Sequence, residues 1–374
     1  MISKKCSWWF KSSKVSIKAE YIQLHCLSIM TSVNNNTKVW LNEVSFMRPF
    51  LLFLLVSYHA FAPWCGAWGL PVGCHDYESY RWVALFSRAF RLEAFVFVSG
   101  YIFTFQMLEK NKFTSFGQFL KSKIVRLLIP CWVFGILYFI LFKKYVNIWQ
   151  TIYNIGGGIG HLWYLPCLFI CFIAQYFLLE LKTNTKITLV ILICLVFLSF
   201  VPLPLHLNQP LYFILFFYGG GLFYQNKDSV ALRANTKSIL LCWTIFAALL
   251  VIINLWFIQS EKFANPTLLK IAVLGSNKIL KSILAWSGIT ALYLTAVQYC
   301  RTYKISDFIL KIGVCGYGVY VFHQFVLVWM YDKTPLPEIL GTYWLPWVGL
   351  AVATVVSVLL TLAVRSTKLG RKFL

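Results

Sequence analysis

The 374-residue chain is 59% hydrophobic, 18% aromatic and only 12% charged, with a formal net charge of +22. A soluble protein of this length needs more polar surface, so the composition excludes a soluble enzyme and indicates a multi-pass membrane protein without a sizeable soluble domain. The positive charge does not indicate nucleic acid, because no soluble basic face exists to hold one. It fits instead the Lys and Arg residues that cytoplasmic loops of membrane proteins collect.

Residues 1–40 differ from the rest of the chain. They contain several lysines and no apolar run long enough to cross a bilayer. They also lack the long apolar segment and the small-residue cleavage site of a secretory signal peptide. We expect a basic, disordered cytoplasmic arm, or upstream sequence added by a misassigned start, with Met30 as the alternative start. Residues 41–366 then form the transmembrane domain, and residues 367–374 form a short basic cytoplasmic tail.

Hydrophobic segments that are long enough, or nearly so, to cross a bilayer follow the arm. We therefore predict an all-α fold of about ten transmembrane helices. Lys and Arg are concentrated in the N-terminal arm and in alternate loops, which predicts that both termini are cytoplasmic. Lysines between the seventh and eighth spans break this pattern. The predicted spans are 44–64, 83–107, 124–142, 161–180, 187–204, 210–225, 238–258, 279–299, 312–331 and 343–364.

The first span contains two ionisable residues, Arg48 and His59, in the segment MRPFLLFLLVSYHAF. Eleven helical steps of about 100° bring both side chains to within roughly 20° of one face. They lie roughly 16 Å apart along the axis, which places Arg48 at the membrane edge and His59 near the middle. An ionisable group at that depth is a functional hypothesis. The alternative is an arginine that snorkels to the interface and a histidine satisfied by a neighbouring helix.

Further polar residues occur inside later spans. Arg91 and Glu93 lie in the second span, but they are only two positions apart, so we expect Glu93 to find its partner on another helix. Ser99 with its neighbouring glycine predicts a close helix approach. His161 lies at the mouth of the fourth span and His323 lies well inside the ninth. Two deep histidines, an aligned arginine and a buried glutamate predict a shared polar cavity.

A cluster of cations, Lys121, Lys123 and Arg126, precedes the third span. Such cations usually serve topology and lipid phosphate, but next to Arg48 they would also suit a soluble phosphorylated cofactor. The cysteines show no CxxC motif and no Cys/His spacing typical of zinc, so we expect no metal site. Cys65 and Cys74 flank a polar loop, and whether they pair stays open.

In its motifs the chain resembles the integral-membrane acyltransferase-3 proteins, which O-acylate cell-envelope and secreted glycans. Arg48 and His59 resemble the Arg-x10-His signature of that family. The segments FVFVSGYIF, RLLIPCWVF, HLWYL and GVYVFH follow in the family's order. The chain departs from the family in having Pro49 where glycine is common and VCGYG where Ser-Tyr-Gly is common. It also lacks the soluble esterase-like domain that some relatives carry.

The resemblance implies a membrane O-acyltransferase. It would move an acyl group, most simply acetyl, from cytoplasmic acyl-CoA to a hydroxyl of an envelope or secreted carbohydrate. Arg48, Arg126 and Lys123 would hold the phosphates of acyl-CoA, and His59 would act as a general base or carry the acyl group covalently. The residues expected to line the acceptor side or the shared cavity are Glu93, Arg91, Ser99, His161, Trp163 and His323.

The same resemblance implies a multi-pass protein of the bacterial inner (plasma) membrane. Its partners would be membrane lipid, a carbohydrate acceptor that is free or lipid-linked, and proteins of polysaccharide assembly, with no nucleic acid. The main alternative is a transporter or flippase for a lipid-linked glycan or another solute, because intramembrane Arg, Glu and His also serve proton and substrate pathways. The halves of the chain show no inverted-repeat similarity, and consumption of acyl-CoA would distinguish the two functions. A catalytically inactive scaffold is disfavoured because Arg48 and His59 are both present.

Overall fold

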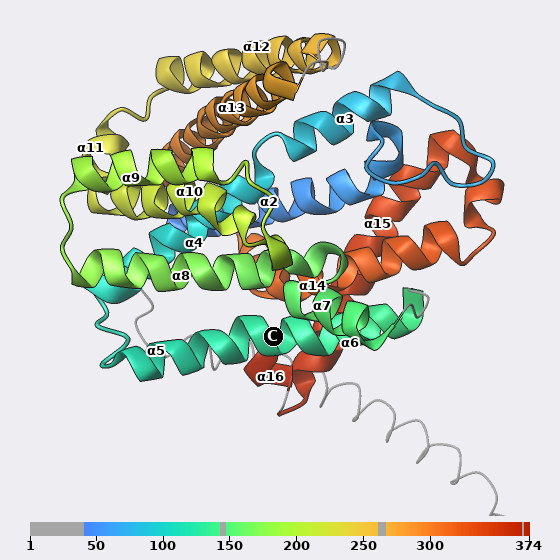
Figure 1. The fold of residues 1–374 in the computed structure, drawn as a ribbon, viewed down its shortest axis with the longest axis horizontal. Coiled ribbons are helices and arrows are strands. Elements are labelled where there is room, and N and C mark those ends of the chain that lie inside the picture. The colour runs from blue at the N-terminus through green and yellow to red at the C-terminus, as the bar shows by residue number, and fades with distance from the viewer. Residues whose placement is uncertain (1–40, 143–146, 261–266, 369) are drawn as a thin grey trace, which may run out of the picture. The chain divides into compact units, whose positions relative to one another are not determined.

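The computed structural model describes residues 41–142, 147–260, 267–368 and 370–374. Over these residues the secondary structure is helical and contains no strand, which confirms the predicted all-α class (Figure 1). The predicted N-terminal arm, residues 1–40, lies outside the described residues. The predicted C-terminal tail contains one short helix, α16 (Gly370–Phe373).

The described residues form long helices joined by short helical turns. They are α2 (Asn42–Ala60), η1 (Ala62–Cys65), α3 (Glu78–Arg88), α4 (Arg91–Leu108), α5 (Phe116–Lys123), η2 (Ile124–Leu128), α6 (Ile129–Phe142), α7 (Ile148–Gly157), η3 (Gly160–Trp163), α8 (Tyr164–Glu180), α9 (Thr185–Leu198), η4 (Pro204–His206), α10 (Asn208–Gln225), α11 (Lys227–Leu232), α12 (Thr236–Ser260), α13 (Thr267–Thr302), α14 (Asp307–Asp332) and α15 (Leu336–Ser366).

Six helical segments of the described chain are long and apolar enough to cross a membrane. Four of the predicted spans correspond instead to α2, α4, α9 and α10, which do not reach the same length and apolar content. The count of ten spans and the orientation of the termini therefore stay predictions. The six segments are Phe116–Phe142, Gly160–Glu180, Thr236–Trp256, Gly275–Thr302, Asp307–Asp332 and Leu336–Ser366.

Several span boundaries differ from the predicted ones. The second predicted span is two helices, α3 and α4, that meet at Ala89 and Phe90. Arg91 is therefore the first residue of α4, and Glu93 lies in its first turn. The positive end of the helix dipole stabilises a carboxylate there. Pro49 lies inside α2 and not in its first turn.

The third span also begins earlier than predicted, at Phe116, and it is not uniformly α-helical. Its middle section, η2, is a π-helix that carries Arg126. Single π-turns widen a helix locally and are frequent at functional sites. The sequence pattern of apolar residues does not reveal this turn.

Helix α2 lies at the centre of the described helices. It packs against α3, α4, α13, α14 and α15, and most of its apolar side chains are buried. Helices α12 and α13 pack side by side at one edge of this group (Figure 1). Because α2 carries both Arg48 and His59, its neighbours decide what those two side chains meet.

The packing of α4 on α10 depends on glycine at the points of closest approach. A Cβ added at Gly100 would collide with the carbonyl oxygen of Phe217, and one added at Gly220 would collide with that of Phe97. The two backbones therefore touch, as the small residues at this position predict. The neighbouring Ser99 hydroxyl donates to the Phe95 carbonyl oxygen at 2.8 Å, so it satisfies its own helix.

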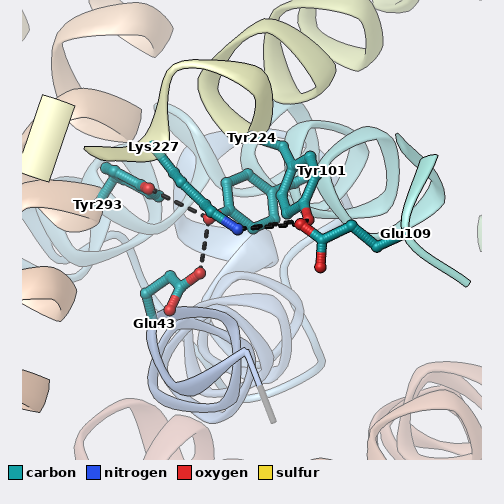
Figure 2. Close-up of polar contacts among 6 residues, drawn as sticks. All are labelled: Glu43, Tyr101, Glu109, Tyr224, Lys227 and Tyr293. Atoms are coloured by element: carbon teal, nitrogen blue, oxygen red, sulfur yellow. Dashed lines mark hydrogen bonds and ion pairs between the residues drawn. The ribbon is translucent and has the colours of Figure 1, made fainter. Parts of the chain in front are cut away.

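Polar contacts fix the first turn of α2 to two other helices. The Tyr101 hydroxyl on α4 donates to Glu43 Oε1 at 2.6 Å (Figure 2). The same hydroxyl lies 3.3 Å from that of Tyr293 on α13. A carboxylate that accepts from a tyrosine in this way is held in one position. This contact therefore fixes where α2 begins.

A second polar group lies beside the first and joins α4 to α10 and α11. The ring of Tyr224 on α10 packs edge-on against the ring of Tyr101, with centroids 5.1 Å apart. The Tyr224 hydroxyl donates to Glu109, and Lys227 Nζ lies 3.1 Å from the same carboxylate (Figure 2). The Tyr224 hydroxyl and then the Lys227 ammonium hold the pKa of Glu109, just beyond α4, below its usual range.

Gly220→Ala is expected to destabilise the protein because the new methyl group collides with backbone that cannot move independently. Overpacking of this kind costs about 1–3 kcal/mol. The apparent melting temperature in detergent should fall below that of wild type. The matched control is Gly316→Ala on α14, where a Cβ meets nothing within 4 Å. Equal melting temperatures for the two variants would contradict the proposed backbone contact between α4 and α10.

Tyr101→Phe is expected to loosen the start of α2 because it removes the hydrogen bond to Glu43. A hydrogen bond to a charged group contributes about 1.5–3 kcal/mol. Thermal unfolding of the purified protein should show a lower transition for this variant. Tyr303→Phe, at a side chain that is 60% exposed, is the control and should melt as wild type does. An unchanged transition for Tyr101→Phe would show that the cluster does not hold α2.

Candidate functional site

Three histidines from separate parts of the chain form a row. His59 lies at the end of α2, His323 lies within α14, and His161 lies in η3. The ring centroid of His323 is 4.9 Å from that of His59 and 5.1 Å from that of His161. All three side chains are buried. The structure thus brings together the histidines that the sequence placed in three different spans.

Backbone carbonyl groups identify the protonated nitrogen of two of these rings. His323 Nδ1 lies 2.9 Å from the Val319 carbonyl oxygen, and His161 Nε2 lies 3.0 Å from that of Val321. A carbonyl oxygen only accepts, so these nitrogens donate. In the neutral rings the other nitrogens, His323 Nε2 and His161 Nδ1, carry lone pairs. Both are buried and have no hydrogen-bond partner among the described residues, and the same holds for His59 Nδ1.

Arg91 brings a positive charge to this row. Its guanidinium carbon lies 3.7 Å from the centroid of the Tyr58 ring, a cation–π contact, and the side chain is buried. Its charge acts on both His59 and His323. Within the described residues its Nε and one terminal nitrogen have no hydrogen-bond partner. A buried arginine with unused donors can stabilise negative charge that develops on a bound molecule.

Helix α14 positions His161 through two neighbours of His323. Gln324 Oε1 accepts from the His161 backbone N–H at 3.0 Å, and the Tyr320 hydroxyl donates to the His161 carbonyl oxygen at 2.6 Å. Further along the helix, the Tyr331 hydroxyl donates to the Ala60 carbonyl oxygen at 2.7 Å and so fixes the end of α2 beside His59. Sequence reasoning missed these residues, although Tyr320 and Gln324 stand in the segment GVYVFHQF.

Trp68 covers His59 from the loop that follows η1. Its ring centroid lies 5.7 Å from that of His59 and 6.2 Å from that of Tyr331. Tryptophan near the end of a membrane span is common at the interface with water. Trp68 instead closes one side of the histidine row.

Glu93 does not join the histidines. Lys281 Nζ on α13 lies 3.6 Å from its carboxylate, and the Tyr212 hydroxyl on α10 donates to it at 3.2 Å. The partner thus comes from other helices, as the sequence predicted, and no contact links Glu93 to a histidine among the described residues. Ser99, which bonds to its own helix, also lies outside the histidine row.

A cluster of four cations lies toward the other end of α2. It consists of Arg48, Lys112, Lys123 and Arg126, and the charge of Arg126 acts on each of the other three. Arg48, Lys112 and Arg126 are exposed. None of the four forms an ion pair with a carboxylate in the part of the chain that the structure describes. Four neighbouring cations without acidic partners make an anion-binding surface.

Aromatic rings hold one member of this cluster in place. Lys123 Nζ lies 3.4 Å above the centroid of the Phe172 ring and within 6 Å of the Phe103 and Phe119 ring centroids. Sequence reasoning missed Lys112 because it lies in the loop before α5. In a loop, position along the chain does not show how deep in the membrane a side chain lies. Lys121, which the sequence grouped with Lys123, is exposed on α5 and does not belong to the cluster.

Other candidate ligands do not converge in the same way. No group of three His, Cys, Asp or Glu side chains among the described residues is placed to hold a metal ion. Cys65 and Cys74 are both free thiols. The side chains of the histidine row supply imidazole and guanidinium groups, with the Tyr320 hydroxyl and the Gln324 amide beside them.

Comparison with known families gives one result. The acyltransferase-3 family model, described as an acyltransferase domain, matches residues 41–365. That range contains the histidine row, Arg91 and the cation cluster. Neither the curated proteins nor the solved structures gave a match. The family match covers most of the chain, and together with the apolar helices it shows that the chain belongs to the acyltransferase-3 family and is a multi-pass membrane acyltransferase.

Proposed function

We propose that the protein is an O-acyltransferase of the bacterial inner membrane that transfers an acyl group, most simply acetyl, from cytoplasmic acyl-CoA to a carbohydrate hydroxyl. One observation carries the proposal. His59, Arg91, His161 and His323 are buried neighbours, and each has a polar side-chain atom without a partner among the described residues. Burying such atoms is costly unless a ligand satisfies them.

The cation cluster supports acyl-CoA as the donor. Acyl-CoA carries its phosphates at one end and its thioester at the other, separated by the pantetheine arm. Arg48 and His59 stand eleven residues apart on α2, which corresponds to roughly 16 Å along a helix axis. Phosphates bound by Arg48 and Arg126 would let the arm run along α2 and place the thioester beside His59. Arginine suits this role because its planar fork pairs with phosphate oxygens.

Two routes of transfer fit the histidine row. In the direct route an imidazole nitrogen takes the proton of the acceptor hydroxyl, the oxygen forms a bond to the thioester carbon, and the carbon–sulfur bond breaks. The proton then passes to the departing CoA thiolate. In the covalent route an imidazole nitrogen of His59 bonds to the thioester carbon, the carbon–sulfur bond breaks and CoA leaves as the thiolate. The acceptor oxygen then bonds to the acyl carbon, the carbon–nitrogen bond breaks, and the freed imidazole takes the hydroxyl proton. In both routes Arg91 would stabilise the oxyanion that forms at the carbonyl oxygen.

His59→Ala is expected to abolish transfer because it removes the group that holds the proton or the acyl chain. Removing a general acid–base group typically costs a factor of about 10² to 10⁴. Incorporation of labelled acetyl from acetyl-CoA into an envelope-glycan extract measures it, with His75→Ala at an exposed histidine as the control. Near-normal incorporation by a folded His59→Ala protein would end the catalytic proposal. No incorporation by wild type with any acyl-CoA would favour transport.

Arg48→Gln and Lys123→Gln are expected to raise the KM for acetyl-CoA, because each removes a charge-assisted contact to phosphate. One such contact contributes about 1.5–3 kcal/mol, or roughly 10- to 100-fold in affinity. Acetyl-pantetheine carries no phosphate, so its KM should change little in the same variants. Lys121→Gln, outside the cluster, is the matched control and should behave as wild type. Equal losses for acetyl-CoA and acetyl-pantetheine would place the phosphate site elsewhere.

A further inference from the structure

The loop between η1 and α3 carries one side chain that lies against the histidine row. In this Trp68 loop, residues 66–73, the ring centroid of Trp68 is 5.7 Å from that of His59 and 6.2 Å from that of Tyr331. The exposed fraction of His59 is 9%, against 6% and 0% for the other two histidines of the row. Trp68 therefore stands against the histidine that solvent reaches most easily.

The two ends of the Trp68 loop are fixed to other parts of the chain through backbone groups. Near its start, the backbone N–H of Trp68 donates to the carbonyl oxygen of Ala62 in η1 at 3.4 Å. Just beyond its end, the backbone N–H of His75 donates to Thr342 Oγ1 on α15 at 2.9 Å. The loop thus runs as an arch between η1 and α15.

The middle of the arch is held much less firmly than its ends. Leu70 is 40% exposed and Val72 is 73% exposed. The backbone hydrogen bond in this stretch is local, from the Cys74 N–H to the Pro71 carbonyl oxygen at 3.1 Å. A segment with exposed side chains and few contacts to the rest of the protein opens at a low cost in free energy.

Glycines stand at both boundaries of the Trp68 loop. Gly66 and Gly73 have φ values of +74° and +78°, which glycine adopts without strain. Residues at such boundaries absorb the dihedral changes of a hinge. The Trp68 side chain has ring contacts and no hydrogen bond among the described residues, so its movement away from His59 breaks no polar contact. The loop therefore has the features of a lid that closes through one ring.

Water is the competing acceptor at an acyl-transfer site. When the oxygen of a water molecule bonds to the acyl carbon, the carbon–sulfur bond of the thioester breaks, or the carbon–nitrogen bond of an acyl-imidazole. The acyl group then leaves as a carboxylic acid, and an imidazole takes the second proton of the water and passes it to the CoA thiolate. Closing a site against water prevents this side reaction.

We propose that the Trp68 loop is a lid that keeps water from His59, and that Trp68 thereby determines how much of the acyl group is transferred and how much is hydrolysed. This inference rests on the proposed O-acyltransferase function. It adds a residue that controls the outcome of the reaction without taking part in bond formation. The lid opens to admit the acceptor and closes on the loaded site.

The first test needs no acyl donor. Diethyl pyrocarbonate modifies accessible imidazole nitrogens, and peptide mass spectrometry follows its reaction with His59 in the purified protein in detergent. Trp68→Ala should speed the labelling of His59 by roughly tenfold, because labelling follows the fraction of molecules in which the ring is exposed. The exposed His206 is the internal reference and should label at the same rate in both proteins. Equal labelling of His59 in wild type and in folded Trp68→Ala would overturn the proposal.

The second test measures what becomes of the acetyl group. Acetate and glycan-bound acetyl are quantified separately after reaction of labelled acetyl-CoA with the envelope-glycan extract. In Trp68→Ala the ratio of acetate to transferred acetyl should rise by roughly tenfold, since water enters the site. Trp68→Phe keeps a ring and should show a smaller rise, which also covers the case in which the alanine variant does not fold. Trp149→Ala, at a residue on α7 that is 78% exposed, is the matched control. A ratio equal to that of wild type in both Trp68 variants would refute the lid.

The outcomes also separate this inference from the proposed function. Faster labelling of His59 in Trp68→Ala, without acetyl transfer by wild type to any acceptor, would contradict the O-acyltransferase and leave the Trp68 loop as a cover of the histidines. Acetyl transfer that depends on His59, with labelling and acetate ratio unchanged in Trp68→Ala, would retain the enzyme and remove the lid.

Discussion

The structure depends on one constraint, the cost of leaving polar atoms unpaired away from water. Most buried polar groups of the described residues avoid this cost because they have a partner. The Tyr101 hydroxyl donates to Glu43, and Glu93 accepts from Tyr212 and lies beside Lys281. Eight buried side-chain atoms of the described residues lack a partner, and five of them belong to three neighbouring histidines and Arg91, the other three being on Thr104, Gln175 and Ser357. A fold that concentrates most of its unpartnered buried polar atoms at one place is prepared for a ligand there.

Helix α14 organises that place more than α2 does. It supplies His323, it holds η3 through Tyr320 and Gln324, and it ties down the end of α2 through Tyr331. Tyr320, Gln324 and Tyr331 do not belong to the histidine row themselves. Each fixes the backbone at or beside one of its histidines. The cation cluster at the other end of α2 is built differently, from three exposed side chains, the half-buried Lys123 and a π-helical turn. The two regions thus suit the two ends of a long donor.

The sequence predicted the all-α class because apolar spans leave few alternatives to helices in a membrane. It also predicted that Arg48 and His59 share one face of the first span, because their spacing fits a whole number of turns, and both do lie on α2. It could not reveal the break at Ala89 and Phe90, since neither residue is a helix breaker such as Gly or Pro. Membrane helices also pack without a strong pattern in the sequence, so the sequence could not show which helices bring His161 and His323 beside His59.

The turn at η4 was harder to foresee for a related reason. It has left-handed backbone at Leu205 and His206, where neither residue type indicates that conformation. Lys112 belongs to the cation cluster but lies in a loop, where the sequence does not show how deep in the membrane a side chain lies. By contrast, the small residues at Ser99 and Gly100 did predict close helix packing, because only glycine permits backbones to touch.

The central claim is that one donor molecule spans α2, with its phosphates at the cation cluster and its reactive end at the histidines. The most direct measurement is an electron cryo-microscopy structure of the protein with CoA bound. The account predicts phosphate density against Arg48 and Arg126 and a thiol sulfur within about 4 Å of His59, close to reacting distance. Phosphates bound away from these arginines, or a thiol remote from all three histidines, would contradict it.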